Sequence, residues 1–169
     1  EDHIGGLDNV IKTFEVGQIY MPKKGTTTQT YTEILDAAEK KNVSIKSPKI
    51  GEKFNIGDAK CEVLFVDDTT EELNNNSIVI SMKYGNQKYL FTGDLEGEGE
   101  ESLVASNNLP EVELFKAAHH GSYTANTDEL LSVIKPENVV VCCSAGNTKY
   151  TDIVLNTFPS QTAINNFAK

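Results

Sequence analysis

Apolar residues recur at helical spacing in several stretches of the chain. Leu7, Val10, Ile11 and Phe14 are spaced so that they share one face of a helix. Pro136 stands just beyond another such stretch, as is typical of a residue that ends a helix. The spacing predicts helices over residues 7–14, 31–41, 99–106, 127–134 and 160–169.

Other stretches have the pattern of strands. Residues 77–84 alternate between two faces, and Gly85-Asn86 is the kind of pair that forms a hairpin turn. Residues 87–91 are then the returning strand. Further strands are predicted over residues 16–21, 61–66, 112–118 and 139–143, with a short extended piece over 43–46.

This order of elements predicts an α/β (α+β) fold. The hairpin requires antiparallel pairing, and the alternation of strands with helices places helices over the faces of sheets. We therefore expect a sandwich of two mixed sheets with helices outside, and not a doubly wound parallel sheet. We expect residues 1–169 to form a single domain of this kind.

Composition restricts the class of protein. Hydrophobic residues make up 38% and charged residues 24%, which is typical of a globular chain and not of a disordered one. No apolar run approaches the ~20 residues of a membrane span. The net charge is −10 and all 15 basic residues are lysines, so binding of nucleic acid through basic residues alone is not favoured. A metal-dependent phosphodiesterase stays possible, because bound cations offset local acidity.

The cysteines do not indicate a disulfide framework or a cysteine-based zinc site. Cys61, Cys142 and Cys143 are few and irregularly spaced, and none forms a CxxC pair. Cys142 and Cys143 end an apolar run, so we expect them to be buried in a strand. The oligomeric state and the cellular compartment are left open.

Most of the candidate metal ligands lie where predicted strands end. The chain has three histidines: His3 follows Asp2, while His119 and His120 follow a strand. Asp94 ends another strand. Imidazole and carboxylate together suit Zn²⁺ or Mn²⁺, and neighbouring glycines leave room for tight turns and for substrate. If the strands before Asp94 and the histidine pair are neighbours, Asp94 should face one histidine and the other should point away.

Three motifs, in this order, resemble those of the metallo-β-lactamase superfamily. Residues 1–6, Glu-Asp-His-Ile-Gly-Gly, resemble the end of its HxHxDHxGG motif, and Thr92-Gly93-Asp94 resembles its strand-end aspartate. The sequence from Asn76-Ser77 to His119-His120-Gly121-Ser122 is similar to the soluble hydrolase domain of the ComEC competence proteins and their secreted relatives. The resemblance implies a partial αββα sandwich, incomplete at the N-terminus and at the C-terminus. It also suggests extracellular or membrane-attached localisation through segments outside this chain.

The resemblance also implies roles for individual residues. Asp2 and His3 would bind the second metal, Asp94 would bridge two metals, and His119 or His120 would complete the site. Asp2 and Asp94 are then the catalytic candidates, and Gly121 and Ser122 the substrate-binding candidates. The intact domain would hold two divalent cations, Zn²⁺ or Mn²⁺, whereas this chain would bind at most one and would be inactive.

These roles predict a metal-dependent hydrolase with a metal-bound hydroxide as nucleophile. Its substrate would be a phosphodiester, either nucleic acid or a phosphorylated cell-envelope polymer. A lactonase or thioesterase on the same fold is the alternative within the class, and a binding module that has lost its metals is the alternative outside it. Asp94 could instead cap a turn, the histidines could be structural, and Asp2-His3 could be disordered.

Two further features of the sequence bear on the site. The related proteins often carry a Tyr-Gly-His-Pro segment after the last strand, but the matching region here, residues 146–152, has no histidine. The acidic residues from Glu96 to Glu101 are read as a charge bias at the start of a helix.

Overall fold

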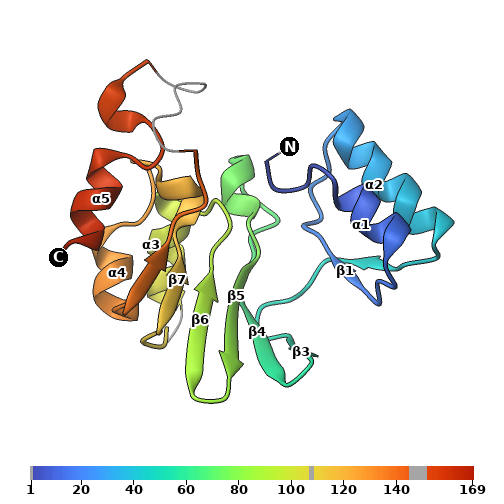
Figure 1. The fold of residues 1–169 in the computed structure, drawn as a ribbon, viewed down its shortest axis with the longest axis horizontal. Coiled ribbons are helices and arrows are strands. Elements are labelled where there is room, and N and C mark those ends of the chain that lie inside the picture. The colour runs from blue at the N-terminus through green and yellow to red at the C-terminus, as the bar shows by residue number, and fades with distance from the viewer. Residues whose placement is uncertain (1, 107–108, 145–151) are drawn as a thin grey trace. The chain divides into compact units, whose positions relative to one another are not determined.

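The computed structural model describes residues 2–106, 109–144 and 152–169 (Figure 1). Within them the chain forms two compact units, Glu1–Pro48 and Lys49–Lys169. We describe each unit by itself, and the prediction of a single domain stays a prediction.

The first unit is built on a pair of helices. Its elements are α1 (Leu7–Thr13), β1 (Ile19–Tyr20), α2 (Gln29–Lys40) and β2 (Ile45–Lys46). Thr28 caps α2 by accepting a hydrogen bond from the Tyr31 N–H at 3.3 Å. Ile11 of α1 packs with Ile34 and Ala37 of α2 in a small core. The two helices therefore form where the apolar spacing predicts them.

The second unit holds a six-stranded mixed sheet in the order β3-β4-β5-β6-β7-β8. The first four strands form an antiparallel meander, and β6, β7 and β8 are parallel. The elements are β3 (Lys53–Ile56), β4 (Ala59–Phe65), the 3₁₀ turn η1 (Leu73–Asn76), β5 (Val79–Tyr84), β6 (Gln87–Phe91), α3 (Glu98–Ser106), β7 (Leu114–Lys116), the turn η2 (Ala118–Gly121), α4 (Asp128–Ile134), β8 (Asn138–Val140), η3 (Val154–Asn156) and α5 (Gln161–Phe167).

The core of this unit lies between the sheet and its helices. Leu90 of β6 and Phe115 of β7 are fully buried, together with Leu103 of α3 and Leu130 of α4. Figure 1 shows α3, α4 and α5 gathered at the parallel end of the sheet, beside β7. This arrangement follows from the two strand–helix–strand connections, because a helix must carry the chain back before a parallel strand can form.

The predicted fold class is confirmed, with corrections to individual elements. The smaller sheet is a two-stranded parallel pair and not a mixed sheet, because α2 carries the chain across between β1 and β2. Strand β3 has no counterpart in the predictions. Strand β8 ends at Val140, so Cys142 and Cys143 are exposed, contrary to the prediction that they are buried in a strand.

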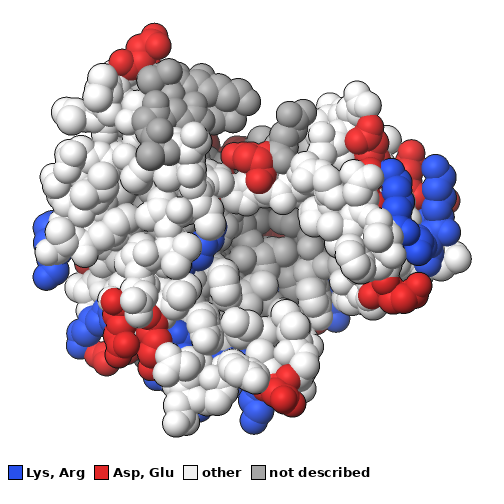
Figure 2. Space-filling view, in the orientation of Figure 1, with Lys and Arg blue, Asp and Glu red and all other residues white. Residues whose placement is uncertain are grey.

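Lysines and acidic residues are interspersed on the face drawn in Figure 2, and the lysines there do not form a continuous basic stripe. Among the described residues, no helix has the length and apolar character that crossing a bilayer requires.

One buried carboxyl group joins two helices in the second unit. Glu100 of α3 is fully buried and accepts hydrogen bonds from the N–H groups of Asn126 at 2.7 Å and Thr127 at 2.9 Å. Burial raises the pKa of the Glu100 carboxyl, although these hydrogen bonds oppose the rise. Glu100 lies in the first turn of α3, as the helix-start charge bias predicts, but its side chain is buried and ties α3 to the start of α4.

Glu100→Ala should lower the free energy of unfolding by about 2–5 kcal/mol, because it leaves two buried N–H groups without an acceptor. Denaturant-induced unfolding measures the change. Glu101→Ala is the matched control, since Glu101 is an exposed neighbour on the same helix and its loss should have little effect. Equal stability of the two variants would contradict the role given to Glu100.

Candidate metal centre

Several chain segments meet at one edge of the six-stranded sheet. Phe91 of β6 lies opposite Lys116 of β7, and Lys116 lies opposite Val140 of β8. Because parallel neighbours end at the same edge, the loops that follow these strands leave the sheet together. The strands that precede Asp94 and the histidine pair are therefore neighbours, which is the condition under which Asp94 is expected to face a histidine.

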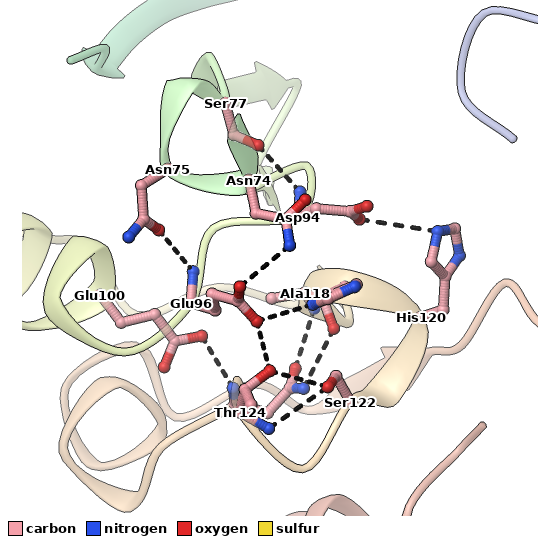
Figure 3. Close-up of polar contacts among 12 residues, drawn as sticks. Asn74, Asn75, Ser77, Asp94, Glu96, Glu100, Ala118, His120, Ser122 and Thr124 are labelled. Carbon is pink, nitrogen blue, oxygen red and sulfur yellow. Dashed lines mark hydrogen bonds and ion pairs between the residues drawn. The ribbon is translucent and has the colours of Figure 1, made fainter. Parts of the chain in front are cut away.

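The turn that carries Asp94 is fixed by the segment before β5. Gly93 has a φ of +60°, and a Cβ atom there would lie 2.7 Å from Ser77 Oγ, so the position requires glycine. Ser77 Oγ accepts a hydrogen bond from the Asp94 N–H at 2.9 Å (Figure 3). The Gly93 carbonyl accepts from Lys116 Nζ at 3.3 Å and from the His119 N–H at 3.1 Å. The Asp94 backbone therefore has a defined position beside the end of β7.

A tight turn carries the two histidines. His119 and His120 have φ values of 44° and 54°, a region in which residues other than glycine are uncommon. The buried side chain of Asn126 makes two hydrogen bonds to the backbone of Ala118, where the turn begins. Its Oδ1 accepts from the Ala118 N–H at 2.8 Å, and its Nδ2 donates to the Ala118 carbonyl at 3.1 Å. The two rings face different ways because of this left-handed turn, and not through the alternation of a strand.

His120 is the histidine that faces Asp94. Its Nε2 lies 3.6 Å from Asp94 Oδ1, and both side chains are less than a fifth exposed (Figure 3). Its other ring nitrogen, Nδ1, lies 2.8 Å from the Cys142 carbonyl oxygen. Because a carbonyl can only accept, Nδ1 must carry the hydrogen. In neutral imidazole this leaves the lone pair on Nε2, directed toward the Asp94 carboxylate.

The geometry of Asp94 and His120 fits a divalent cation. With bonds of ~2.0–2.2 Å, two ligand atoms of one tetrahedral ion lie about 3.3–3.6 Å apart, close to the separation found here. A histidine that donates its second N–H to a backbone carbonyl is the usual arrangement around a bound metal. A carboxylate with an imidazole suits Zn²⁺, and Mn²⁺ is also accommodated. These two residues therefore could hold one ion together with ligands from elsewhere.

His119 takes part in a separate polar network. Its Nδ1 lies 2.8 Å from Glu96 Oε2, which also accepts a hydrogen bond from Thr124 Oγ1. The other carboxylate oxygen, Glu96 Oε1, accepts from Asn74 Nδ2 at 2.9 Å. Figure 3 shows Glu96 at the centre of these contacts. Glu96 is thus not part of a simple helix-start charge bias, because it orients His119 and joins three loops.

The network also sets the charge of Glu96. Burial works to raise its pKa, but the hydrogen bonds from Thr124, Asn74 and His119 together outweigh burial, and the pKa of Glu96 lies below its ordinary value. Glu96 is therefore a carboxylate at neutral pH. The sequence offers one signal for it, since it stands two residues after Asp94.

Gly121 and Ser122 support the histidine turn. A Cβ atom on Gly121 would lie 2.8 Å from Pro159 Cβ, so glycine permits close packing there. Ser122 is buried, and its Oγ is hydrogen-bonded to Thr124 Oγ1 at 2.8 Å. Both residues have clear structural tasks, and their role in substrate binding stays a prediction.

Asp2 and His3 belong to the first unit. They lie in the turn that precedes α1, and both are exposed. Gly6, with a φ of +87°, follows them and begins the helix as its N-cap. The predicted metal-binding role of Asp2 and His3 stays a prediction.

An aromatic residue that the sequence did not single out lies next to both histidines. Phe158 has its ring centroid 5.8 Å from that of His119 and 6.2 Å from that of His120. The region compared above with a Tyr-Gly-His-Pro segment, residues 146–152, lies outside the described residues apart from Asp152. No local pattern in the sequence predicts that Phe158 reaches the histidines.

Comparison with known proteins agrees with this geometry. The model of the metallo-beta-lactamase superfamily matches residues 1–145. The chain belongs to this superfamily. Most superfamily members are hydrolases that bind divalent metals, and the matched range includes Asp94 and both histidines of the turn.

The similar curated proteins are related to competence and recombination. ComE operon protein 3 of Bacillus subtilis (strain 168) is 29% identical over 150 residues, which cover 87% of this chain and 19% of that protein. Recombination protein 2 of Haemophilus influenzae is 23% identical over 146 residues, 86% of this chain and 17% of that protein. Competence protein ComA of Neisseria gonorrhoeae is 36% identical over 76 residues, 44% of this chain and 11% of that protein. The chain thus spans about a fifth or less of their lengths.

Thr124→Val should lower the free energy of unfolding by about 1.5–3 kcal/mol at pH 7, because it removes a hydrogen bond to the charged Glu96 carboxylate. The pKa of Glu96 is depressed from its ordinary 4.5 in the folded chain, so this stabilisation is present above pH 4.5 and is lost as the pH falls through the folded pKa. Unfolding at a series of pH values measures the difference between the two proteins.

Thr162→Val, at an exposed position of α5, is the control and should differ little from the unmodified protein at any pH. A loss caused by Thr124→Val that stays constant from pH 7 to well below 4.5 would show that the hydrogen bond does not stabilise the charged form.

Proposed function

We propose that this chain is part of a metal-dependent hydrolase that cleaves phosphodiester bonds, with Asp94 and His120 as ligands of its divalent cations. One observation carries the proposal. Asp94 Oδ1 and His120 Nε2 face one another at 3.6 Å while the second nitrogen of His120 is tied to the Cys142 carbonyl. This donor set resembles the binding geometry of Zn²⁺ and Mn²⁺.

The remaining ligands in this proposal come from the opening motif. Asp2 and His3 would join Asp94 and His120 around one cation, since the superfamily motif places an aspartate and a histidine there. Asp94 has two carboxylate oxygens and can therefore bridge to a second cation. Cations held there would polarise a phosphate group and activate water for attack.

His119 has a different task in the proposed site. Because the Glu96 carboxylate can only accept, His119 Nδ1 carries the hydrogen. Nε2 then holds the lone pair in the neutral ring, and it can donate to a substrate oxygen only when the ring is protonated. Lys116, with its ammonium group at the Gly93 carbonyl, adds a positive charge beside the turn that carries Asp94. The protein therefore offers one imidazole for metal, and another imidazole and an ammonium group for an anionic substrate.

The proposal of a phosphodiester substrate rests on the relatives as well as on the site. The names of two of them refer to recombination and to competence, which are processes that handle DNA. The net charge of −10 does not oppose an anionic substrate, because bound cations reverse the local charge. Fold membership alone would not choose among substrates.

Asp94→Ala should reduce hydrolysis of bis(p-nitrophenyl) phosphate by the full-length protein to less than about a tenth, because the variant lacks the carboxylate that holds the cations. Release of p-nitrophenol with added Zn²⁺ or Mn²⁺ measures the rate. Asp58→Ala, in an exposed turn, is the matched control and should retain full activity.

The activity and metal content of the unmodified protein distinguish the proposed phosphodiesterase from the two alternative functions. Hydrolysis of a lactone or a thioester without any phosphodiester cleavage would identify a different hydrolase on the same fold. No hydrolysis and no bound metal in the full-length protein would identify a non-catalytic binding module.

His120→Ala should weaken metal binding by at least about 100-fold, because loss of a ligand costs no less than loss of a residue that supports one. His119→Ala is the matched control and should keep its metal content, while it lowers activity. Elemental analysis after dialysis against a weak chelator measures both. Loss of metal from His119→Ala and retention by His120→Ala would reverse the assignment of the two histidines.

A further inference from the structure

Phe158 stands beside the proposed reaction site without belonging to its polar network. Its ring is tilted by 41° to His119 and by 84° to His120, at centroid separations of 5.8 and 6.2 Å. Both separations are within the range for interacting rings, and neither imidazole lies parallel to the phenyl ring. The histidines therefore touch Phe158 without forming a stack with it.

The backbone around Phe158 is held firmly against the histidine turn. The Ser160 N–H donates to the Gly121 carbonyl at 2.8 Å, and Pro159 packs where a side chain on Gly121 would otherwise lie. Ser160 is fully buried, and its Oγ accepts from the Ala163 N–H at 3.1 Å to cap α5. The ring is thus positioned by its neighbours in the chain, and it needs no burial of its own to stay in place.

Unlike the core aromatic residues, Phe158 is only partly buried. Phe115, which has the same side chain, is 0% exposed in the hydrophobic core, and Phe158 is not a member of that core. A rigid, partly exposed ring next to a site for phosphodiesters is suited to a nucleobase, since every base has a face that can stack on an aromatic ring.

We propose that Phe158 is the platform on which an unpaired nucleobase stacks, next to the phosphodiester that the Asp94–His120 site would cleave. The substrate class is then single-stranded nucleic acid, because a base within a duplex already stacks on its neighbours. This proposal rests on the proposed phosphodiesterase function and makes its substrate more specific.

The charge of the chain supports a contribution from stacking. Proteins that hold nucleic acid through its phosphates alone use many basic side chains, whereas here the net charge is −10 and the whole chain has 15 basic residues against 25 acidic ones. Stacking supplies affinity that does not depend on lysines. It also tolerates any base, so the proposal predicts little sequence preference.

The experiment compares two single-stranded oligonucleotides of equal length with the full-length protein and Mn²⁺. One carries ordinary bases, and the other carries abasic residues on both sides of the same scissile phosphate. Phe158→Ala should raise KM for the ordinary oligonucleotide by about 5- to 150-fold and should leave KM for the abasic one unchanged. Phe158→Trp should restore the lower KM.

Phe14→Ala, which removes an exposed phenylalanine of the first unit, is the matched control and should leave both KM values unchanged. An equal change for both oligonucleotides in Phe158→Ala, or a fall in kcat alone, would show that the ring only positions the histidines and would overturn the proposal. Binding of a glycerol phosphate polymer in preference to the ordinary oligonucleotide, with no effect of Phe158→Ala, would also overturn it.

An absence of hydrolase activity can be distinguished from an absence of base stacking on Phe158. If the unmodified protein cleaves neither oligonucleotide, fluorescence anisotropy of the uncleaved, labelled oligonucleotides still measures binding. Binding that depends on the bases and is lost in Phe158→Ala would support the stacking platform without the hydrolase. Equal binding of both oligonucleotides by the unmodified protein would overturn the platform.

Discussion

The parallel pairing of β6 with β7 determines where the chemistry of this chain can lie. Phe91 and Lys116 are opposite one another, so the loops that follow them leave the sheet at the same edge. One loop carries Asp94 and the other carries His120, which approach to 3.6 Å. A shift of register along either strand would separate these two side chains, because each residue of a strand advances it by roughly 3.3 Å. Because the buried faces of Leu90 and Phe115 oppose such a shift, packing of the core also fixes the geometry of the candidate site.

A second constraint comes from polar side chains that hold the loops at this edge. Asn126 satisfies both backbone groups of Ala118 and so maintains the left-handed turn that separates the directions of the two imidazoles. Glu96 is hydrogen-bonded to Asn74, His119 and Thr124, which lie on two other segments, while buried Glu100 joins α3 to α4. Buried networks of this kind specify one arrangement when every member has its partners. Here they hold His119 against Glu96 and leave Nε2 of His120 facing Asp94.

The sequence predicts the elements better than it predicts the contacts. The hairpin follows from the alternation over residues 77–84 and from the turn pair Gly85-Asn86, which makes Gln87–Phe91 the returning strand. The strand Lys53–Ile56 is not predicted, because it alternates polar and apolar residues over four positions only. Glu96 resembles any solvated carboxylate in the sequence, since its partners come from other loops. The choice of His120 over His119 depends on backbone angles that the residue types do not reveal. Phe158 reaches the histidines only through tertiary folding, which leaves no local pattern.

The central claim is that Asp94 and His120 bind the same cation. Anomalous diffraction from a crystal of the full-length protein grown with Mn²⁺ tests it most directly, because the anomalous signal locates the ion independently of the protein atoms. The account predicts an anomalous peak within about 2.0–2.3 Å of both Asp94 Oδ1 and His120 Nε2, with Glu96 still bound to His119. A peak coordinated by His119 in place of His120, or no peak beside Asp94 at saturating Mn²⁺, would contradict it.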